Sequence, residues 1–167
     1  MEALRSLEER KAILRWGYRA MWNERDLTWL DDVVAEDVVV HDAVHGELHG
    51  LDELAELVSA VHRAFSDLEV TIEEQTGDGD TVVTRYSLSG THEGEMIGAS
   101  PTGKRVTVTG VNISRFSGAQ IVEVWETWDA LRLVQQLGLR RLWRGFIVPR
   151  RLPSRAEAKL SRIAPSR

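Results

Sequence analysis

The spacing of the apolar residues changes once along this chain, near residue 67, and this change constrains the fold more than any other feature. Before it, apolar residues recur every three or four positions, which is the spacing of helices packed on a core. The helices predicted by this spacing cover Leu7–Met21, Leu27–Val34 and Leu54–Phe65. A short β-branched run at Asp37–Asp42 interrupts them and is expected to form a strand.

From Leu68 onward the apolar residues alternate with polar ones, as they do in strands that bury one face. Turn-forming residues divide this part of the chain at 77–80, 98–103 and 117–119. The predicted strands lie near 68–75, 81–92, 105–116 and 120–128. Helices followed by consecutive hairpins are typical of an α+β domain, in which an antiparallel sheet packs one face against the helices.

The composition is that of a globular protein with one domain. The chain has 167 residues, of which 43% are hydrophobic and 28% are charged, and this is enough to enclose a single core. It contains no cysteine, which excludes disulfides, thiolate metal sites and thiol catalysis. Charges interrupt the amino-terminal segment and no later apolar run could span a bilayer, so we expect a cytoplasmic protein.

Charge divides the chain into an acidic body and a basic carboxyl-terminal extension. Residues 1–136 hold 12 basic and 25 acidic residues, a net charge of −13, which argues against nucleic acid as a ligand. Residues 137–167 carry a net charge of +8. We therefore expect a domain at 1–138 and an extension at 139–167. We expect an amphipathic helix over Leu139–Ile147, which would pack on the body or on a second subunit, or would contact an anionic membrane without inserting. A disordered tail would follow this helix.

Four ordered segments resemble one family. They read DLTWLDDVVAEDVVVHD, RAFSDLEVTIEE, GTHEGEMIGASPTGKRVTVTGVNISRF and QIVEVWETWDALRLVQQLG. Together they resemble the SnoaL-like polyketide cyclases, or ester cyclases, of the nuclear transport factor two-like superfamily, over roughly residues 5–138. The resemblance implies a cone-shaped barrel, whose strongly curved mixed, mainly antiparallel sheet wraps the helices around a pocket. It also implies cofactor-free aldol ring closure on a hydrophobic conjugated substrate, and a homodimer formed through the outer sheet face.

Glu126 is the candidate acid/base, because the family carries an aspartate at the matching position of the last strand. The side chain of Glu126 is one methylene longer and lies between Trp125 and Trp128. Val122, Val124, Glu126 and Trp128 share one strand face, but the opposite face also holds apolar and acidic residues, so alternation alone leaves the inner face open. If Glu126 points inward, burial should raise its pKa.

Further residues match positions that line the family's pocket. Asn112 matches a polar position and would orient Glu126 or hold a substrate carbonyl, or else bond locally. Trp22 and Leu57 match pocket residues on the helices, although both are equally ordinary as core residues. His41 and His92 are candidates for a general acid or for the rim of the pocket. Val124 and Trp128 would form its wall beside Glu126.

Two alternatives remain open at this stage. His41, His45 and His49 are spaced as zinc ligands on a helix would be, but Gly46 and Gly50 disfavour a helix there, so we expect no metal. The same pocket could also hold a hydrophobic ligand without turnover, because one fold serves several functions. The lack of a second well-placed catalytic group in the sequence favours this non-catalytic reading.

Overall fold

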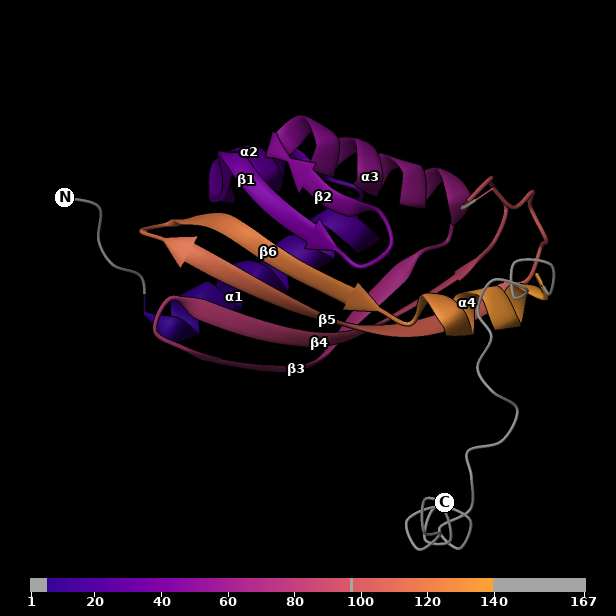
Figure 1. Cartoon of the computed structure of the whole chain (residues 1–167). Coiled ribbons are helices and arrows are strands. Elements are labelled where there is room, and N and C mark those ends of the chain that lie inside the picture. Colours follow the sequence, from indigo (N-terminus) through magenta and orange to yellow (C-terminus); the bar gives the residue numbers. More distant parts are fainter. Residues whose placement is uncertain (1–5, 97, 140–167) are drawn as a thin grey trace, which may run out of the picture.

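A computed structural model of the chain describes residues 6–96 and 98–139 (Figure 1). The helices are α1 (Leu7–Tyr18), the π-helical turn η1 (Arg19–Asn23), α2 (Thr28–Val33), α3 (Gly50–Ala64) and α4 (Ala130–Leu137). The strands are β1 (Val34–Asp42), β2 (Gly46–His49), β3 (Glu69–Asp78), β4 (Thr81–Thr91), β5 (Arg105–Ser117) and β6 (Gln120–Trp128). The predicted α+β order of helices and hairpins is confirmed.

The six strands form one open sheet in the order β2-β1-β6-β5-β4-β3. Strands β3 to β6 are joined as antiparallel hairpins, while β1 runs parallel to β6 and makes the sheet mixed. The strongly curved mixed sheet implied by the resemblance is confirmed, and because β2 and β3 remain as edges it does not close into a complete barrel. Sequence alone missed β2, since its four residues contain a single apolar side chain.

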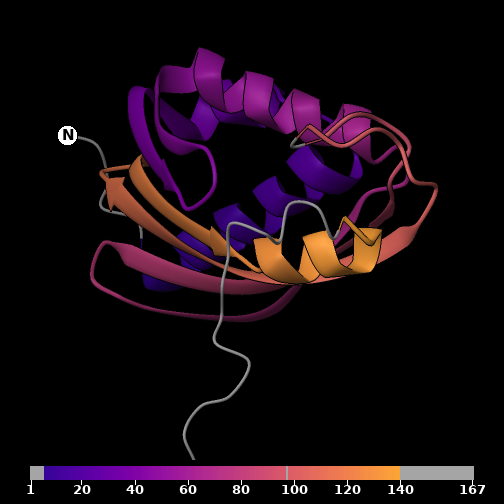
Figure 2. The ribbon, with the colours of Figure 1, turned by 45° about the vertical axis from the view of Figure 1, so that its right-hand side comes forward.

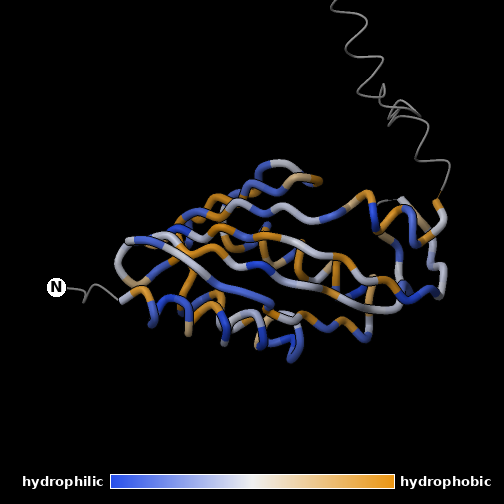
Figure 3. Tube along the Cα trace, turned by 90° about the horizontal axis from the view of Figure 1, so that it is seen from below, coloured by the Kyte–Doolittle hydropathy of each residue, from blue (hydrophilic) through white to orange (hydrophobic). Residues whose placement is uncertain are grey.

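The helices α1 and α3 lie on the same side of the curved sheet (Figures 1 and 2). Side chains alternate between the faces, as β5 shows most clearly, because every second residue from Val106 to Phe116 is buried. Polar and apolar residues likewise alternate along the strands in Figure 3. The inner face therefore presents one continuous surface to the helices, and the space between them holds the core and the candidate site.

The first helix does not continue regularly to Met21 as predicted. It changes into a π-helical turn at Arg19–Asn23, which carries Met21 and Trp22. The side chain of Asn23 then bonds to both backbone groups of Val70 on the edge strand β3, accepting from its N–H at 2.8 Å and donating to its carbonyl at 3.0 Å. These bonds tie the turn to the sheet edge and hold Trp22 in position. Wide turns of this kind are frequent at functional sites.

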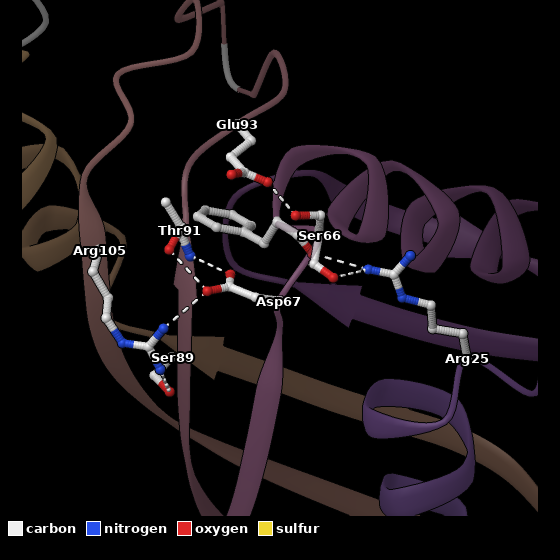
Figure 4. Close-up of polar contacts among 8 residues, drawn as sticks. Arg25, Ser66, Asp67, Ser89, Thr91, Glu93 and Arg105 are labelled. Carbon is white, nitrogen blue, oxygen red and sulfur yellow. Dashed lines mark hydrogen bonds and ion pairs between the residues drawn. The ribbon is translucent and has the colours of Figure 1, made fainter.

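A polar cluster fixes the junction between α3 and β3 (Figure 4). Asp67 accepts hydrogen bonds from the backbone and hydroxyl of Thr91, and it forms an ion pair with Arg105 at 2.9 Å. Ser66 donates to Glu93, while Arg25 donates to the carbonyl of Ser66. The cluster joins four segments that are distant in sequence, and it holds the end of α3 against the long hairpin β4–β5.

Within residues 6–96 and 98–139, no helix is long and apolar enough to cross a membrane. The amphipathic helix expected over Leu139–Ile147 and the tail after it lie outside the described residues, apart from Leu139.

Candidate active site

A cavity of about 140 Å³ lies between the helices and the inner face of the sheet. Its lining is mainly apolar, and most of its polar members come from the strands. The residues predicted from sequence that line it are Trp22, Leu57, Asn112, Val124, Glu126 and Trp128. The polar lining residues that sequence did not single out as site residues are Tyr18, Asp42, His45, Tyr86 and Ser114.

The inner face of β6 is the face that carries Glu126. Val124, Glu126 and Trp128 line the cavity, whereas Trp125 between them is 39% exposed on the other side of the sheet. The question that alternation left open is therefore settled by the packing of β6 between β1 and β5.

Two neighbouring strands hold the carboxylate of Glu126 through hydrogen bonds. The phenol of Tyr86 on β4 donates to Oε1 at 2.6 Å, and the amide of Asn112 on β5 donates to Oε2 at 2.9 Å. Ser114 donates to the amide oxygen of Asn112 at 2.6 Å, which leaves the amide nitrogen directed at Glu126. Both oxygens of the carboxylate are thus fixed by groups that are themselves held in place.

Strand register explains why these side chains meet. Asp42, Glu126, Asn112 and Thr84 are direct partners across β1, β6, β5 and β4, so they form one polar row on the inner face. A polar row across a sheet that otherwise faces an apolar core is costly unless its members bond to one another or to a ligand. Asn112 makes the hydrogen bond to Glu126 that the predicted orienting role requires, and the role itself stays a prediction.

Tyr86 reaches Glu126 because its partner on β5 is a glycine. Tyr86 pairs with Gly110, and a Cβ at Gly110 would collide with the phenol ring of Tyr86. The ring therefore lies across the backbone of β5 towards β6. Tyr86 was not predicted from the sequence because a tyrosine in a strand is usually a core residue. The sequence feature that could have indicated it is Gly110, a glycine in the middle of the longest strand.

The pKa of Glu126 is raised from its ordinary value to about 7, chiefly because burial disfavours the charged carboxylate. The negative charge of nearby Asp42 raises it further, while the hydrogen bonds from Tyr86 and Asn112 act in the opposite direction. Burial, followed by the charge of Glu126, raises the pKa of both Tyr86 and Tyr18. The phenols therefore remain protonated, and Tyr86 donates to a carboxylate that exchanges its proton near neutral pH.

This raised pKa predicts that stability falls as pH rises. The pKa of Glu126 is about 7 in the folded protein, and its ordinary value is 4.5. Between these two pH values Glu126 is therefore protonated in the folded protein and ionised in the unfolded chain. The free energy of unfolding should therefore decrease by about 2 to 3 kcal/mol between pH 5 and pH 8 relative to Glu126→Gln. Denaturant titrations of both proteins measure the difference, and equal pH slopes would contradict it.

The family assignment follows from comparison with known proteins. The model of the SnoaL-like polyketide cyclase family matches residues 12–137, which is most of the chain. The chain belongs to this family. A search of curated proteins found no match.

Solved structures agree with this assignment. The proposed polyketide cyclase IdmH from Streptomyces antibioticus is 31% identical with a TM-score of 0.64, and the match covers 77% of this chain and 97% of that one. AclR from Streptomyces galilaeus, a proposed hydroxylase, is 29% identical with a TM-score of 0.72, covering 80% and 98%. A proposed polyketide cyclase from Acidithiobacillus ferrooxidans is also 29% identical, with a TM-score of 0.70 and coverage of 81% and 99%.

Two histidines predicted for the SnoaL-like site do not line the cavity. His41 lies on the outer face of β1, where it stacks on Trp125 and bonds to Glu123 at 2.9 Å. His92 is fully buried behind the site, packs on Phe65 and shares a hydrogen bond with Thr102. His41 lies on the outer face because alternate residues of β1 point to opposite sides of the sheet. His92 lies away from the cavity because it belongs to the connection between β4 and β5.

The three histidines spaced as metal ligands pair with carboxylates, and two of them share one. His41 bonds to Glu123 and Glu47, His49 also bonds to Glu47, and His45 bonds to Asp42. In the part of the chain that the structure describes, no group of three or more His, Asp or Glu side chains could hold a metal ion. The unexpected result is His45, which lines the cavity although the sequence singled it out only as a zinc candidate.

Proposed function

We propose that this protein is a cofactor-free acid/base catalyst of the cyclase or isomerase type, acting on a hydrophobic conjugated carbonyl compound. The observation that carries the proposal is Glu126, a carboxylate with a pKa of about 7 on the wall of a mainly apolar cavity. A base with this pKa is half-ionised near neutral pH and can both take up and return a proton.

In the proposed reaction, Glu126 removes a proton from the carbon next to a carbonyl group. The resulting enolate attacks a second carbonyl carbon in an aldol closure, or is reprotonated elsewhere in an isomerisation. Asn112 and Tyr86 hold the carboxylate in place through their hydrogen bonds. Trp22, Leu57, Val124 and Trp128 provide the apolar walls that contact the substrate and exclude water.

Proton exchange at carbon tests the proposal without knowledge of the natural substrate. The protein is incubated in D₂O with a panel of apolar conjugated ketones and β-dicarbonyl compounds, and NMR follows deuterium uptake next to the carbonyl. We expect exchange well above the buffer background for at least one compound. Compounds that bind, as measured by tryptophan fluorescence, but exchange only at the background rate would instead support a non-catalytic hydrophobic-ligand-binding module.

We also propose that the outer sheet face forms a homodimer. Trp125 and Val111 are large apolar side chains on that face and are 39% and 38% exposed, which favours a covered surface. Light scattering of the full chain tests this, and a monomer at micromolar concentration would contradict it. The cytoplasmic location and the absence of a nucleic-acid ligand stay predictions.

A further inference from the structure

The buried Asp42 and the partly exposed His45 form a pair on the cavity wall. The side chain of Asp42 is 3% exposed, and its Oδ1 lies 2.9 Å from Nδ1 of His45. The same oxygen accepts the backbone N–H groups of Val44 at 2.8 Å and His45 at 2.7 Å. Three hydrogen bonds to one carboxylate oxygen fix both the turn after β1 and the imidazole that it carries. Both residues line the cavity.

This pair adjoins Glu126. Asp42 and Glu126 are direct partners in the parallel ladder of β1 and β6, so their side chains point to the same face. The backbone N–H of Ala43 donates to the carbonyl of Glu126 at 3.1 Å, which fixes the turn carrying His45 against β6. The negative charge of Asp42 is also close enough to affect the proton affinity of Glu126.

The bond to Asp42 determines which nitrogen of His45 is available. Asp42 accepts from Nδ1, so Nε2 on the far side of the ring is free for a ligand, and the described residues offer Nε2 no hydrogen-bond partner. The carboxylate beside Nδ1 also fixes the orientation of the imidazole ring. The side chain of His45 is 32% exposed, so solvent can return a proton to it after each cycle.

We propose that His45, positioned by Asp42, is the general acid in the reaction for which Glu126 is the base. This inference rests on the proposed function. It assigns the substrate a carbonyl oxygen that becomes negatively charged during the reaction and lies beside Nε2 of His45. The cavity would then hold two groups with separate tasks, one for a carbon-bound proton and one for oxygen.

The step balances without any further reagent. Glu126 takes the proton from carbon, and the electron pair of the C–H bond forms the enolate. In an aldol closure this carbon bonds to the second carbonyl carbon, whose oxygen takes the proton from Nε2 of the imidazolium. Glu126 then releases its proton to water, and His45 takes up a proton from water. The net change is one new C–C bond and one proton moved from carbon to oxygen.

Tyr86 is a poorer candidate for the acid. Its phenol already donates to Oε1 of Glu126, and burial holds its pKa far above neutrality. A group that gives its proton to the base cannot give the same proton to the substrate. His45 also lines the cavity, and its bond to Asp42 through Nδ1 leaves Nε2 for a ligand.

The test uses the carbonyl compound with the fastest turnover and compares His45→Ala, His45→Gln and Asp42→Asn with the parent. His45→Ala should lower kcat/KM about 10²-fold, and the alkaline limb of its pH profile should disappear while the acidic limb due to Glu126 remains. Imidazole added to the solution should restore part of the rate in His45→Ala. Asp42→Asn should lower kcat more than it raises KM, because it leaves His45 in place without its partner. His49→Gln serves as the control, since His49 is exposed and pairs with Glu47 on the same hairpin.

The outcomes separate this inference from the proposed function. If both His45 variants fold and turn over at the parent rate with the parent pH profile, His45 is not the acid, and the separate test of Glu126 as the base is unaffected. A rate loss in His45→Ala without imidazole rescue and with an unchanged profile shape would also overturn the inference. If the parent itself binds carbonyl compounds without exchange, the proposed function fails, and the inference fails with it.

Discussion

Replacing Glu126 with glutamine is expected to lower kcat/KM by about 10³-fold, because the variant keeps the shape of the side chain and removes the only proposed base. The glutamine oxygen can accept from the amide of Asn112 while its NH₂ group donates to the phenol oxygen of Tyr86, so the cavity should keep its form. The affinity for a hydrophobic ligand should change little, since the apolar walls contributed by Trp22 and Trp128 are untouched. Steady-state kinetics and ligand titration measure the two effects separately.

Glu123→Gln is the matched control for this variant. Glu123 lies three residues earlier on β6, faces the outer side of the sheet and pairs with His41 and Arg115. It should retain the parent rate, because the same chemical change is made on the opposite face of the strand. A folded Glu126→Gln protein with the parent rate, or an equal loss of rate in Glu123→Gln, would contradict the role given to Glu126.

Gly110→Ala is expected to damage both the site and the fold. The new methyl group would occupy the space of the Tyr86 ring, which must then move away from β5 and release Glu126. Overpacking of a well-packed core typically costs about 1 to 3 kcal/mol, and loss of an orienting hydrogen bond should lower kcat about 10-fold or more. Thermal denaturation and kinetics of the variant measure the two effects.

The steric explanation for Gly110→Ala can be tested by making the same substitution in a variant that lacks the Tyr86 ring. In Tyr86→Ala the ring is absent, so adding Gly110→Ala should cost far less stability than it does in the parent. Equal costs in the two backgrounds would show that Gly110 is required for another reason, such as backbone geometry. A Gly110→Ala protein with parent stability and parent rate would remove the steric explanation altogether.

The order of elements could be predicted because apolar spacing is a local property of the sequence. The helices, the long hairpins and the candidates Glu126 and Asn112 all follow from spacing or from family resemblance. The strand β2 did not, since Gly46–His49 is a strand through its pairing with β1 and not through its own pattern. The π-helical turn was likewise missed, because Asn23 is held there by contacts with a strand 47 residues later.

The site itself depends on register, which spacing does not provide. Asp42 and Glu126 are 84 positions apart in sequence, and only the parallel pairing of β1 with β6 makes them neighbours. The same pairing places His41 on the outer face and brings His45, in the following turn, to the cavity. His45 therefore lines the cavity, where His41 was expected, because the chain reverses direction after β1.

The central claim is that Glu126 transfers a proton between carbon and solvent in an apolar cavity. The most direct test is the pH dependence of deuterium exchange at carbon, measured for the parent and for Glu126→Gln with the same ketone. The account predicts that the parent rate rises with pH around a midpoint near 7, as the pKa of Glu126 requires, while the variant stays at the buffer background. Exchange in the variant at the parent rate, with the same midpoint, would contradict it.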